Sequence, residues 1–388
     1  MSTSTSVTEQ IDDALAAAVE GGAVPGVAAL VGDRDGVVYS GAFGTRDGDA
    51  PFTTDTVAWL ASTTKSIVAV GALQLVERGA IDLDAPIGPL LPQLANPGVL
   101  EGFDDDGTPR IRPARSAVTL RNLLSHTAGN VYHFWNAHAL RYQRDGGLPS
   151  IDACRNATLT TPLMFDPGTA WEYGMNIDWV GKAVEAASGR SLGDYLRANV
   201  LDPLGLADTT FRLSPEHRSR LATMHIRTPD GPAPLQFEVP QDPEFQMGGG
   251  GMYGSPADYL RFLRMLLRNG ELDGAQILAP ETVAEARRNQ IGDLTVRRLA
   301  TVLPSGSHDV DFLPGTTKKW SLLGMLNVEA TPGGRSPGSL FWAGLCNSYY
   351  WVDWHRGDAG LLVTQVLPFA DPVVLDLFDR FEETSRRR

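Results

Sequence analysis

The chain has 388 residues, of which 43% are hydrophobic and 20% charged, so it is long enough to bury a large core in one large domain or two close ones. Its net charge of −13 argues against nucleic acid or an anionic membrane surface as a partner. The two cysteines, Cys154 and Cys346, form no disulfide framework, and neither a signal-peptide pattern nor an apolar run of membrane-spanning length is present. We therefore expect a soluble, cytoplasmic protein.

Hydrophobic periodicity predicts the elements at the start of the chain. Apolar side chains at helical spacing indicate helices, and runs of β-branched and aromatic residues indicate strands. The predicted elements are a helix over 7–20, strands over 27–31, 37–43 and 57–60, and a helix from Ser62 to about residue 76. The segment Asp33–Gly36 has the composition of a hairpin turn between the first two strands.

The composition changes between residue 80 and about residue 250, where proline is frequent and strand alternation disappears. A short helix capped near Thr119 is predicted in the segment 118–129, and clearer helices are predicted over 176–187 and 192–201. A mixed pattern returns after the glycine run 248–251. The predicted elements there are helices over 259–268, 280–289 and 372–383, and β segments over 320–328, 339–346, 349–354 and 361–366.

Strands near both ends of the chain bracket this helical middle. Sequential antiparallel strands with helices at both chain ends predict an α+β fold, in which a central antiparallel sheet is flanked by helices. Residues 1–79 and 251–388 would form this discontinuous sheet domain, and residues 80–250 would form an inserted, α-rich second lobe. The default place for a site is the cleft between the two, and Ser62 lies where the first part of the chain passes into the second.

Ser62-Thr63-Thr64-Lys65 is the first candidate for chemistry. A lysine three residues after a serine lies one helical turn further on, on the same face. A serine hydroxyl is a weak nucleophile unless a neighbouring base takes its proton. Ser62 and Lys65 have the spacing of a nucleophile and its activator, although a helix-cap serine followed by a solvated lysine has the same spacing.

Two further segments carry candidate groups. A tyrosine beside a lysine ammonium acts as a base when its phenol pKa is lowered, so Tyr173 is one candidate; alternatively, neutral Lys65 is itself the base. The run Phe341–Leu345 places small residues in a predicted strand, which marks the close approach of a ligand or another backbone. It would offer a backbone N–H to an oxyanion, paired with the N–H of Ser62. A half-buried core tyrosine and a tightly packed strand are the plainer interpretations.

The order of Ser62-x-x-Lys65, Tyr173 and Trp342-Ala343-Gly344 resembles the serine β-lactamase and penicillin-binding-protein fold. It is most similar to the family VIII carboxylesterases, which are built like class C β-lactamases. The resemblance covers nearly the whole chain. Further local matches are Asp55-Thr56, Leu123–Gly129, Phe165–Gly168 and the glycine run before Tyr259.

This resemblance implies a role for each matching residue. Ser62 would be the acylated nucleophile, Lys65 would assist proton transfer, and Tyr173 would be the general base in acylation and would activate water in deacylation. The backbone N–H groups of Ser62 and Leu345 would form the oxyanion hole.

Two departures from the β-lactamase pattern bear on the substrate. The lactamase strand motif is Lys-Thr-Gly, whose cation and hydroxyl meet the β-lactam carboxylate, whereas Trp342-Ala343-Gly344 has neither group. Class C enzymes carry an asparagine two residues after the tyrosine; here Met175 takes that position, and Asn176 is one residue too late to inherit the role. Both departures favour a neutral ester over an anionic amide.

Aromatic residues predict the walls of a substrate pocket. Trp342 is one expected wall, with Ala343 and Gly344 beside it and Met175 also in contact with substrate. Phe134 and Trp135, in a loop of the helical lobe, would be another wall, although local packing of that lobe explains them as well. Such walls, with no evident cation, suit a small hydrophobic acyl ester.

The remaining motifs are interpreted as structural. Gly334–Gly338 matches the Gly-x-Ser-x-Gly pattern of α/β-hydrolases around Ser336, but it precedes a predicted strand where that motif requires a helix, so we expect a hairpin loop. His126 is expected to be structural. The other histidines show no metal spacing, and we expect neither a metal nor a cofactor.

The sequence therefore predicts a serine carboxylesterase that hydrolyses short-chain carboxylic esters through an acyl-enzyme on Ser62. The expected partner is a small-molecule ester, with no nucleic acid or membrane partner, and the oligomeric state stays open. Alternatives with the same residues are an amidase or peptidase, an acyltransferase, a weak β-lactamase and a non-catalytic acylated scaffold.

Overall fold

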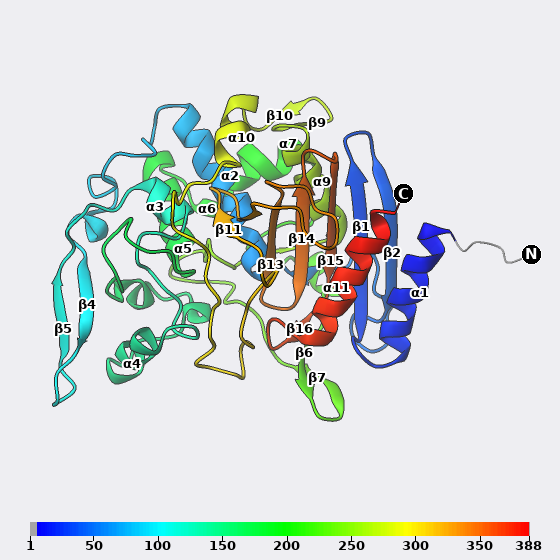
Figure 1. Cartoon of the computed structure of the whole chain (residues 1–388), viewed down its shortest axis with the longest axis horizontal. Helices are drawn as coiled ribbons and strands as arrows, with labels where there is room; N and C mark the ends of the chain where they lie inside the picture. The colour runs from blue at the N-terminus through cyan, green and yellow to red at the C-terminus, as the bar shows by residue number, and fades with distance from the viewer. Residues whose placement is uncertain (1–5, 388) are drawn as a thin grey trace, which may run out of the picture.

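A seven-stranded antiparallel sheet forms the centre of the computed structural model, which describes residues 6–387. The strand order is β11-β12-β13-β14-β15-β1-β2. The strands are β1 (Gly26–Asp33), β2 (Val37–Gly44), β11 (Lys318–Trp320), β12 (Met325–Asn327), β13 (Leu340–Gly344), β14 (Ser348–Asp353) and β15 (Asp358–Val363). The first two strands of the chain thus complete a sheet whose other strands come from its C-terminal part (Figure 1). The predicted α+β class and central antiparallel sheet are confirmed, and the division into a sheet domain and an inserted lobe stays a prediction.

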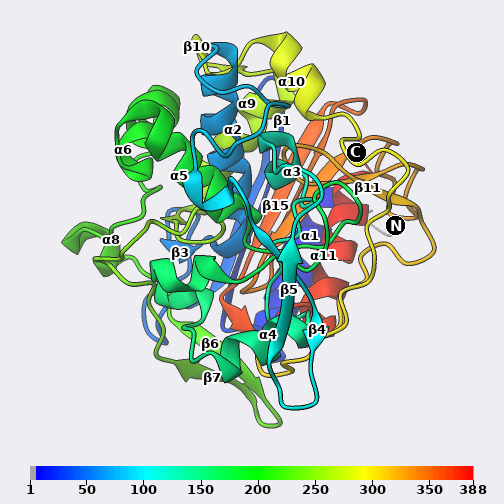
Figure 2. The same cartoon turned by 90° about the vertical axis from the view of Figure 1, so that its left-hand side faces the viewer.

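Helices cover both faces of this sheet. On one face lie α1 (Val7–Glu20) and α11 (Pro372–Ser385), and on the other lie α2 (Thr64–Glu77) and α9 (Pro256–Leu267) (Figures 1 and 2). Successive residues of β14 show why both faces are buried, because side chains alternate across a strand. The rings of Tyr349 and Trp351 contact Phe378 of α11, whereas Tyr350 between them contacts Tyr259 of α9.

Helix α2 lies in the interior, since every residue from Thr64 to Leu75 is buried. A helix that is buried on all sides needs apolar residues on all sides, and the run from Ile67 to Leu75 supplies them apart from Gln74. It packs against α5 (Asn176–Ser188) and α6 (Leu192–Leu196). This position explains how a lysine near its N-terminus comes to be buried.

The middle of the chain contains more β structure than predicted. Two hairpins, β4–β5 and β6–β7, lie there, and β16 adds to the second of them in parallel. Their strands are β4 (Gly98–Phe103), β5 (Pro109–Pro113), β6 (Met224–Thr228), β7 (Gly231–Leu235) and β16 (Val366–Leu367). The prediction missed both hairpins because β5 and β7 each contain two prolines, which read as loop signals, and pair at sheet edges where a missing N–H is tolerated.

The remaining elements are short. They are α3 (Leu120–Leu124), α4 (Ala137–Asp145), α7 (Asp202–Leu204), α8 (Pro215–Ser219), α10 (Pro280–Ala286), β3 (Ala58–Trp59), β8 (Tyr253–Gly254), β9 (Glu271–Leu272) and β10 (Ala275–Gln276), with 3-10 turns at Pro92–Leu94, Ile151–Ala153 and Asn156–Thr160 and a π-helical turn, Arg197–Leu201, that continues α6. Within residues 6–387, no helix has both the length and the apolar content that crossing a bilayer requires.

One predicted β segment, 320–328, is in fact a hairpin. β11 and β12 pair across the turn Ser321–Gly324, in which the hydroxyl of Ser321 accepts the N–H groups of Leu323 and Gly324. The turn lies inside an apolar run, so hydrophobicity alone did not reveal it.

Candidate active site

Ser62 lies in a 3-10 turn, Ala61–Thr63, directly before α2. Pairing of β3 with β8 holds the chain on one side of this turn, and the hydroxyl of Tyr259 donates to the Thr63 carbonyl at 3.0 Å on the other. Ala61 has a φ of 46°, in the left-handed region, which costs a residue with a side chain on the order of 1 kcal/mol. The nucleophile candidate is thus presented on a strained turn in a tightly hydrogen-bonded surrounding.

Lys65 is 4% exposed and points its amine at the Ser62 hydroxyl. Its Nζ lies 3.1 Å from Oγ of Ser62, 3.0 Å from the hydroxyl of Tyr132 and 2.5 Å from the carbonyl oxygen of Gly249. Burial lowers the pKa of Lys65, and the carboxylate of Asp178 opposes this effect. The spacing therefore reflects a direct contact between hydroxyl and amine rather than a helix cap beside a solvated lysine.

Tyr173 completes the group from the segment before α5. The Nε1–H of Trp342 donates to its hydroxyl at 3.0 Å, and Nζ of Lys65 lies 4.7 Å from its ring centroid. Burial raises the pKa of Tyr173 far above its ordinary value, while hydrogen bonds with Ser62 and Trp342 act in the opposite direction. Burial therefore favours the neutral phenol, and whether Lys65 or Tyr173 is the base stays a prediction.

His126 supports Tyr173 from behind. Its ring is fully buried and lies 4.6 Å from the ring of Tyr173, and its Nδ1 accepts the backbone N–H of Gly174 at 3.3 Å. Nδ2 of Asn176 contacts the same Nδ1 at 2.9 Å and donates to the Asn130 carbonyl at 2.7 Å. Asn176 is therefore turned into the core, and the expected structural place of His126 agrees with these contacts.

Leu345 follows β13 directly beside the nucleophile turn. A side chain on Gly344 would lie 2.6 Å from the carbonyl oxygen of Leu60, so the glycine permits the end of the strand to meet this turn closely. Ser62 and Leu345 line the same cavity. Their two backbone N–H groups are the predicted oxyanion hole.

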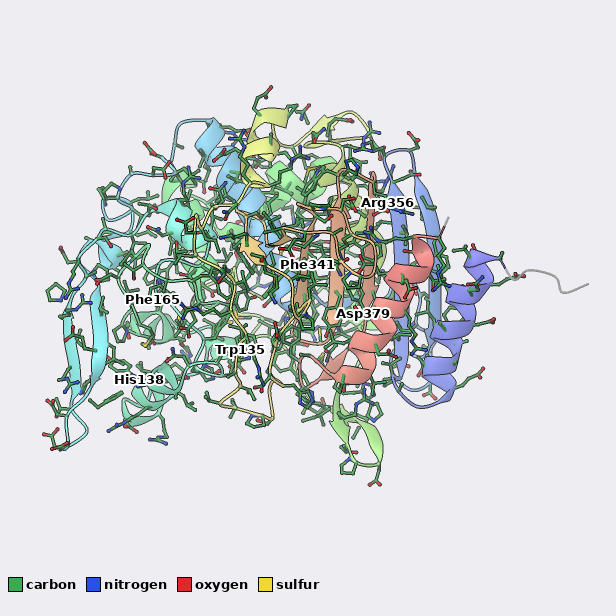
Figure 3. All side chains as sticks on the ribbon, in the orientation of Figure 1. Trp135, His138, Phe165, Phe341, Arg356 and Asp379 are labelled. Carbon is green, nitrogen blue, oxygen red and sulfur yellow. The ribbon has the colours of Figure 1, made fainter. Side chains whose placement is uncertain are left out.

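The cavity above Ser62 has a volume of about 240 Å³. Phe134 and Trp135 line it as expected, and the indole of Trp135 (labelled in Figure 3), which is buried, donates to the hydroxyl of Ser307 at 3.2 Å. The backbone N–H of Val302 donates to the Phe134 carbonyl at 2.9 Å, so the loop around residues 299–310 covers this aromatic wall. The remaining apolar walls are Trp59, Ile151, Phe237, Met247, Leu303 and Leu367.

Four expected pocket residues do not line this cavity. Trp342 is 3% exposed, lies behind Tyr173 and holds its hydroxyl, so it supports the site rather than forming a wall. Ala343 and Gly344 are buried within β13 against the nucleophile turn. Met175 caps α5 and is 5% exposed, with its side chain in the core. Trp342, Ala343 and Gly344 lie one layer below the cavity and Met175 lies in the core, so contact between these four residues and a substrate stays a prediction.

Three site residues were not predicted. Tyr132, Gly249 and Asp178 contact or influence Lys65, and they come from a loop, the glycine run and α5. The sequence predicted Phe134 and Trp135 as an aromatic wall, but it did not reveal that the hydroxyl of neighbouring Tyr132 reaches the Lys65 amine. A glycine run contains no side-chain signal for a carbonyl acceptor, and an aspartate in the first turn of a helix has a common structural explanation.

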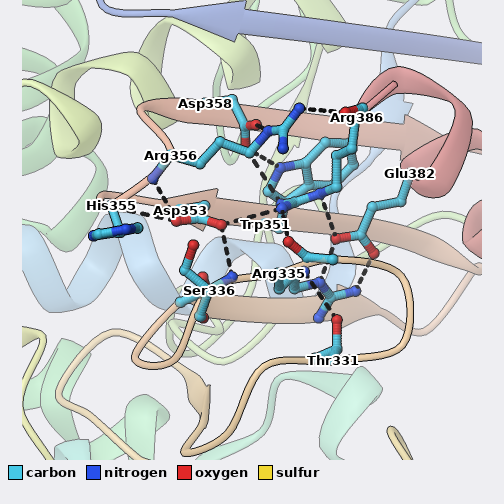
Figure 4. Close-up of polar contacts among 12 residues, drawn as sticks. Thr331, Arg335, Ser336, Trp351, Asp353, His355, Arg356, Asp358, Glu382 and Arg386 are labelled. Carbon is cyan, nitrogen blue, oxygen red and sulfur yellow. Dashed lines mark hydrogen bonds and ion pairs between the residues drawn. The ribbon is translucent and has the colours of Figure 1, made fainter. Parts of the chain in front are cut away.

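Ser336 lies in a different buried group. Its N–H donates to Asp353 at 2.8 Å, next to an ion-pair network in which Arg335 binds Glu382 through two contacts of 2.6 Å and Arg386 binds Asp353 at 3.1 Å (Figure 4). The segment 332–339 is a loop leading into β13, as expected from its place before a strand. Within residues 6–387, no group of three or more histidine, cysteine, aspartate or glutamate side chains is arranged to hold a metal ion.

Comparison with known proteins agrees with the resemblance seen in the motif order. A family model described as Beta-lactamase matches residues 11–381. Monacolin J acid methylbutanoyltransferase from Aspergillus terreus is 33% identical over 96% of this chain and 94% of its own. Lovastatin esterase from Penicillium rubens is 31% identical over 97% of this chain and 98% of its own.

Solved structures show the same relationship. A simvastatin synthase mutant from Aspergillus terreus superposes with a TM-score of 0.84 at 32% identity, covering 98% of this chain and 95% of that chain. The match of the family model over most of the chain and these relatives together identify the fold as that of serine β-lactamases and penicillin-binding proteins. The chain belongs to the Beta-lactamase family.

Proposed function

We propose that this protein is a serine acyl-enzyme that takes an acyl group from a carboxylic ester onto Ser62 and passes it to water or to an alcohol. The observation that carries the proposal is the 3.1 Å contact between Oγ of Ser62 and the buried amine of Lys65 at the floor of an apolar cavity. A hydroxyl beside a base whose pKa is lowered by burial is an activated nucleophile.

In the proposed acylation, each proton that leaves one group is taken up by another. Lys65, in its neutral form, takes the proton of Ser62 while Oγ forms a bond to the ester carbonyl carbon. The oxygen that becomes negative would accept the backbone N–H groups of Ser62 and Leu345. When the bond to the leaving alcohol breaks, the alkoxide takes up a proton, for which the neutral phenol of Tyr173 is the adjacent donor; Lys65 returns the proton to Tyr173.

Deacylation repeats these steps with a new nucleophile. Water or an alcohol gives its proton to the Tyr173–Lys65 pair as it attacks the acyl carbon. When the bond between the acyl carbon and Oγ breaks, Lys65 returns the proton to Ser62, which lies 3.1 Å from its amine. Burial of both groups supports Lys65 as the base and Tyr173 as the relay, because it lowers the pKa of Lys65 and raises the pKa of Tyr173. Tyr132, whose hydroxyl lies 3.0 Å from Nζ, would hold the amine toward Ser62.

The walls of the cavity support a neutral, apolar acyl group. No lysine or arginine is among the described residues that line it, and its walls are mainly aromatic and aliphatic. An anionic β-lactam would therefore lack a counter-charge, as the Trp342-Ala343-Gly344 motif already suggested. A small-molecule ester remains the proposed partner, and we propose a cytoplasmic location for its use.

Two relatives support two fates of the acyl group. The name of one relative describes an esterase, and the name of another a methylbutanoyltransferase. Carboxylesterase activity is our first proposal, and acyl transfer to an alcohol is the second, because a water-poor apolar cavity favours an apolar acceptor over water. Amidase, peptidase or weak β-lactamase activity and a non-catalytic scaffold are less well supported by such a cavity.

Partitioning of the acyl group tests this proposal. Purified protein is given p-nitrophenyl butyrate with and without a hydrophobic alcohol, and free butyrate and the butyrate ester of the alcohol are quantified by chromatography. We expect turnover in both conditions, loss of at least about a thousandfold in Ser62→Ala, and near-normal turnover in the control Ser336→Ala. Full turnover by Ser62→Ala, or hydrolysis of nitrocefin in preference to the ester, contradicts the proposal.

A further inference from the structure

Asp178 is a buried carboxylate that these reaction steps do not use. It lies in the first turn of α5, has no exposed surface, and accepts the backbone N–H of Gly249 on Oδ1 at 2.8 Å. Among the described residues, its Oδ2 has no hydrogen-bond partner. A buried carboxylate is costly unless a positive charge compensates it, and the cation that interacts with Asp178 is Lys65.

Gly249 connects these two charged side chains through one residue. Its carbonyl oxygen accepts Nζ of Lys65 at 2.5 Å, while its N–H donates to Asp178. A Cβ at this position would lie 2.7 Å from Oδ2 of Asp178 and 2.9 Å from the hydroxyl of Tyr132. The missing side chain therefore allows the carboxylate and the phenol to approach the backbone that binds the amine.

We propose that Asp178 is a positioning residue for Lys65: through Gly249 it fixes the carbonyl that binds the amine, and its negative charge compensates the protonated amine in the buried site. The inference rests on the proposed function, in which Lys65 is the base for Ser62. Asp178 does not itself line the cavity; its hydrogen bond is to Gly249, which does, so Asp178 acts through its neighbours.

The direction of the charge effect follows from the environment of the pair. Burial lowers the pKa of Lys65 and the charge of Asp178 opposes this; burial raises the pKa of Asp178 and the charge of Lys65 opposes that. An opposite charge nearby favours the protonated amine. Removing the carboxylate should therefore make Lys65 lose its proton at lower pH.

Other titratable groups around the pair keep their protonation state through the neutral range. Burial, with the charge of Lys65, holds the pKa of His126 well below its ordinary value, and burial raises the pKa of Tyr132 and Tyr173 well above theirs. Burial also raises the pKa of Cys154 to about 12, with a smaller contribution from Asp178. A change in activity near neutral pH then reports on the Lys65–Asp178 pair.

His133 also lies near the site and carries a titratable ring. It lines the cavity beside Asp152, and burial lowers its pKa from the ordinary histidine value while Asp152 opposes the shift. It is present in the wild type and in every variant below, so only the difference between pH profiles is interpreted.

The test is the pH profile of kcat/KM for p-nitrophenyl butyrate in Asp178→Asn. The amide keeps an oxygen that can accept the Gly249 N–H but removes the charge. We expect the acidic limb of the profile to move to lower pH by about one unit or more. A folded Asp178→Asn protein whose acidic limb coincides with that of the wild type overturns the proposal, since a purely structural role lowers stability or kcat without moving the limb.

Asp258→Asn is the matched control. Asp258 is also buried, and its Oδ2 accepts the Asp208 N–H at 2.8 Å and the Thr209 hydroxyl at 3.0 Å, away from Lys65. The same chemical change there should leave the acidic limb in place. An equal shift in Asp258→Asn would show a general effect of removing a buried carboxylate and would overturn the assignment to Asp178.

A second pair of variants covers the case in which Asp178→Asn does not fold. Gly249→Ala keeps both charges but places a methyl group against Asp178 and Tyr132, so we expect kcat to fall at least about tenfold. The control Gly251→Ala places its methyl group 2.9 Å from the Met247 carbonyl, a comparable local conflict that does not involve Lys65. Equal losses in the two folded variants contradict the proposal.

Different results would contradict the proposed function and the role of Asp178. If Ser62→Ala remains active, the proposed function itself is wrong. If Ser62→Ala is inactive and Asp178→Asn leaves the acidic limb unchanged, the function stands and only the role of Asp178 is wrong.

Discussion

At the scale of single residues, the site combines a hydroxyl, a buried amine and two buried phenols. Lys65 is chemically useful because α2 buries it, and it stays ordered because Ser62, Tyr132 and Gly249 occupy its hydrogen-bonding positions. Tyr173 is held in the same way by Trp342. Burial therefore sets both the geometry and the protonation states, and each can be tested by one substitution.

The pH dependence follows from Lys65. A protonated amine cannot accept the Ser62 proton, so kcat/KM should fall by about tenfold per pH unit below the pKa of Lys65 and level off above it. Because burial lowers this pKa, the plateau should begin well below about pH 10, where an ordinary lysine titrates. Ester hydrolysis measured from about pH 5 to about pH 10 checks this. Activity that climbs throughout that range, or a fully active Lys65→Arg protein, contradicts it, since a guanidinium stays protonated.

Trp342→Phe tests the support of Tyr173. The substitution keeps an aromatic ring in the core but removes the N–H that donates to the phenol at 3.0 Å. We expect kcat for p-nitrophenyl butyrate to fall by about tenfold, which corresponds to about 1.4 kcal/mol for one lost hydrogen bond in a buried site. Trp354→Phe, which removes a 2.9 Å bond to the Leu266 carbonyl away from the site, is the control. Equal effects of the two substitutions would argue against a role for the Trp342 N–H.

At the scale of elements, α11 is fixed to the sheet and to the loop before β13 by buried charges (Figure 4). The side chains of Arg335 and Glu382 are 2% and 4% exposed, and Arg335 also lies 4.4 Å from the ring centroid of Phe341 in β13. Because β13 ends at the nucleophile turn, this network supports the strand whose end meets the site.

Glu382→Gln should therefore be destabilising. It leaves Arg335 and Arg386 with one carboxylate fewer, and removing one partner of a buried ion pair costs about 3–5 kcal/mol. The double variant Arg335→Met/Glu382→Leu should be less destabilised than Glu382→Gln, because no isolated charge remains at that pair. Urea unfolding followed by fluorescence gives both values. If Glu382→Gln lowers the free energy of unfolding by less than about 1 kcal/mol, the Arg335–Glu382 pair does not stabilise the fold as proposed.

At the scale of the whole molecule, the sequence identified the parts of the site that carry their own motif. Ser62, Lys65 and Tyr173 were recognised from their order, and the central sheet from strands at both chain ends. Contacts between segments that lie far apart in the sequence were not recognised. Gly249, for example, is 184 residues from Lys65 and 71 residues from Asp178. A carbonyl oxygen has no sequence signal, and a lone tyrosine or aspartate has too many ordinary explanations.

The pocket was predicted less well for a related physical reason. The prediction placed the Trp342-Ala343-Gly344 motif at the wall, whereas the layering of sheet, nucleophile turn and cavity places it one level deeper. Alternation along a strand does not say what lies above a strand that is buried on both faces. Phe134 and Trp135 reach the cavity because the loop around residues 299–310 holds them there.

The proposed function depends most directly on the formation of an acyl-enzyme at Ser62. Protein mixed with p-nitrophenyl butyrate, quenched in acid within its first turnovers and digested, should show by mass spectrometry one butyryl group on the peptide that contains Ser62. The Ser62→Ala protein should carry none, and Ser336→Ala should be labelled like the wild type. A butyryl group on any other residue of the wild type, or turnover without a label in a rapid quench, would contradict the account.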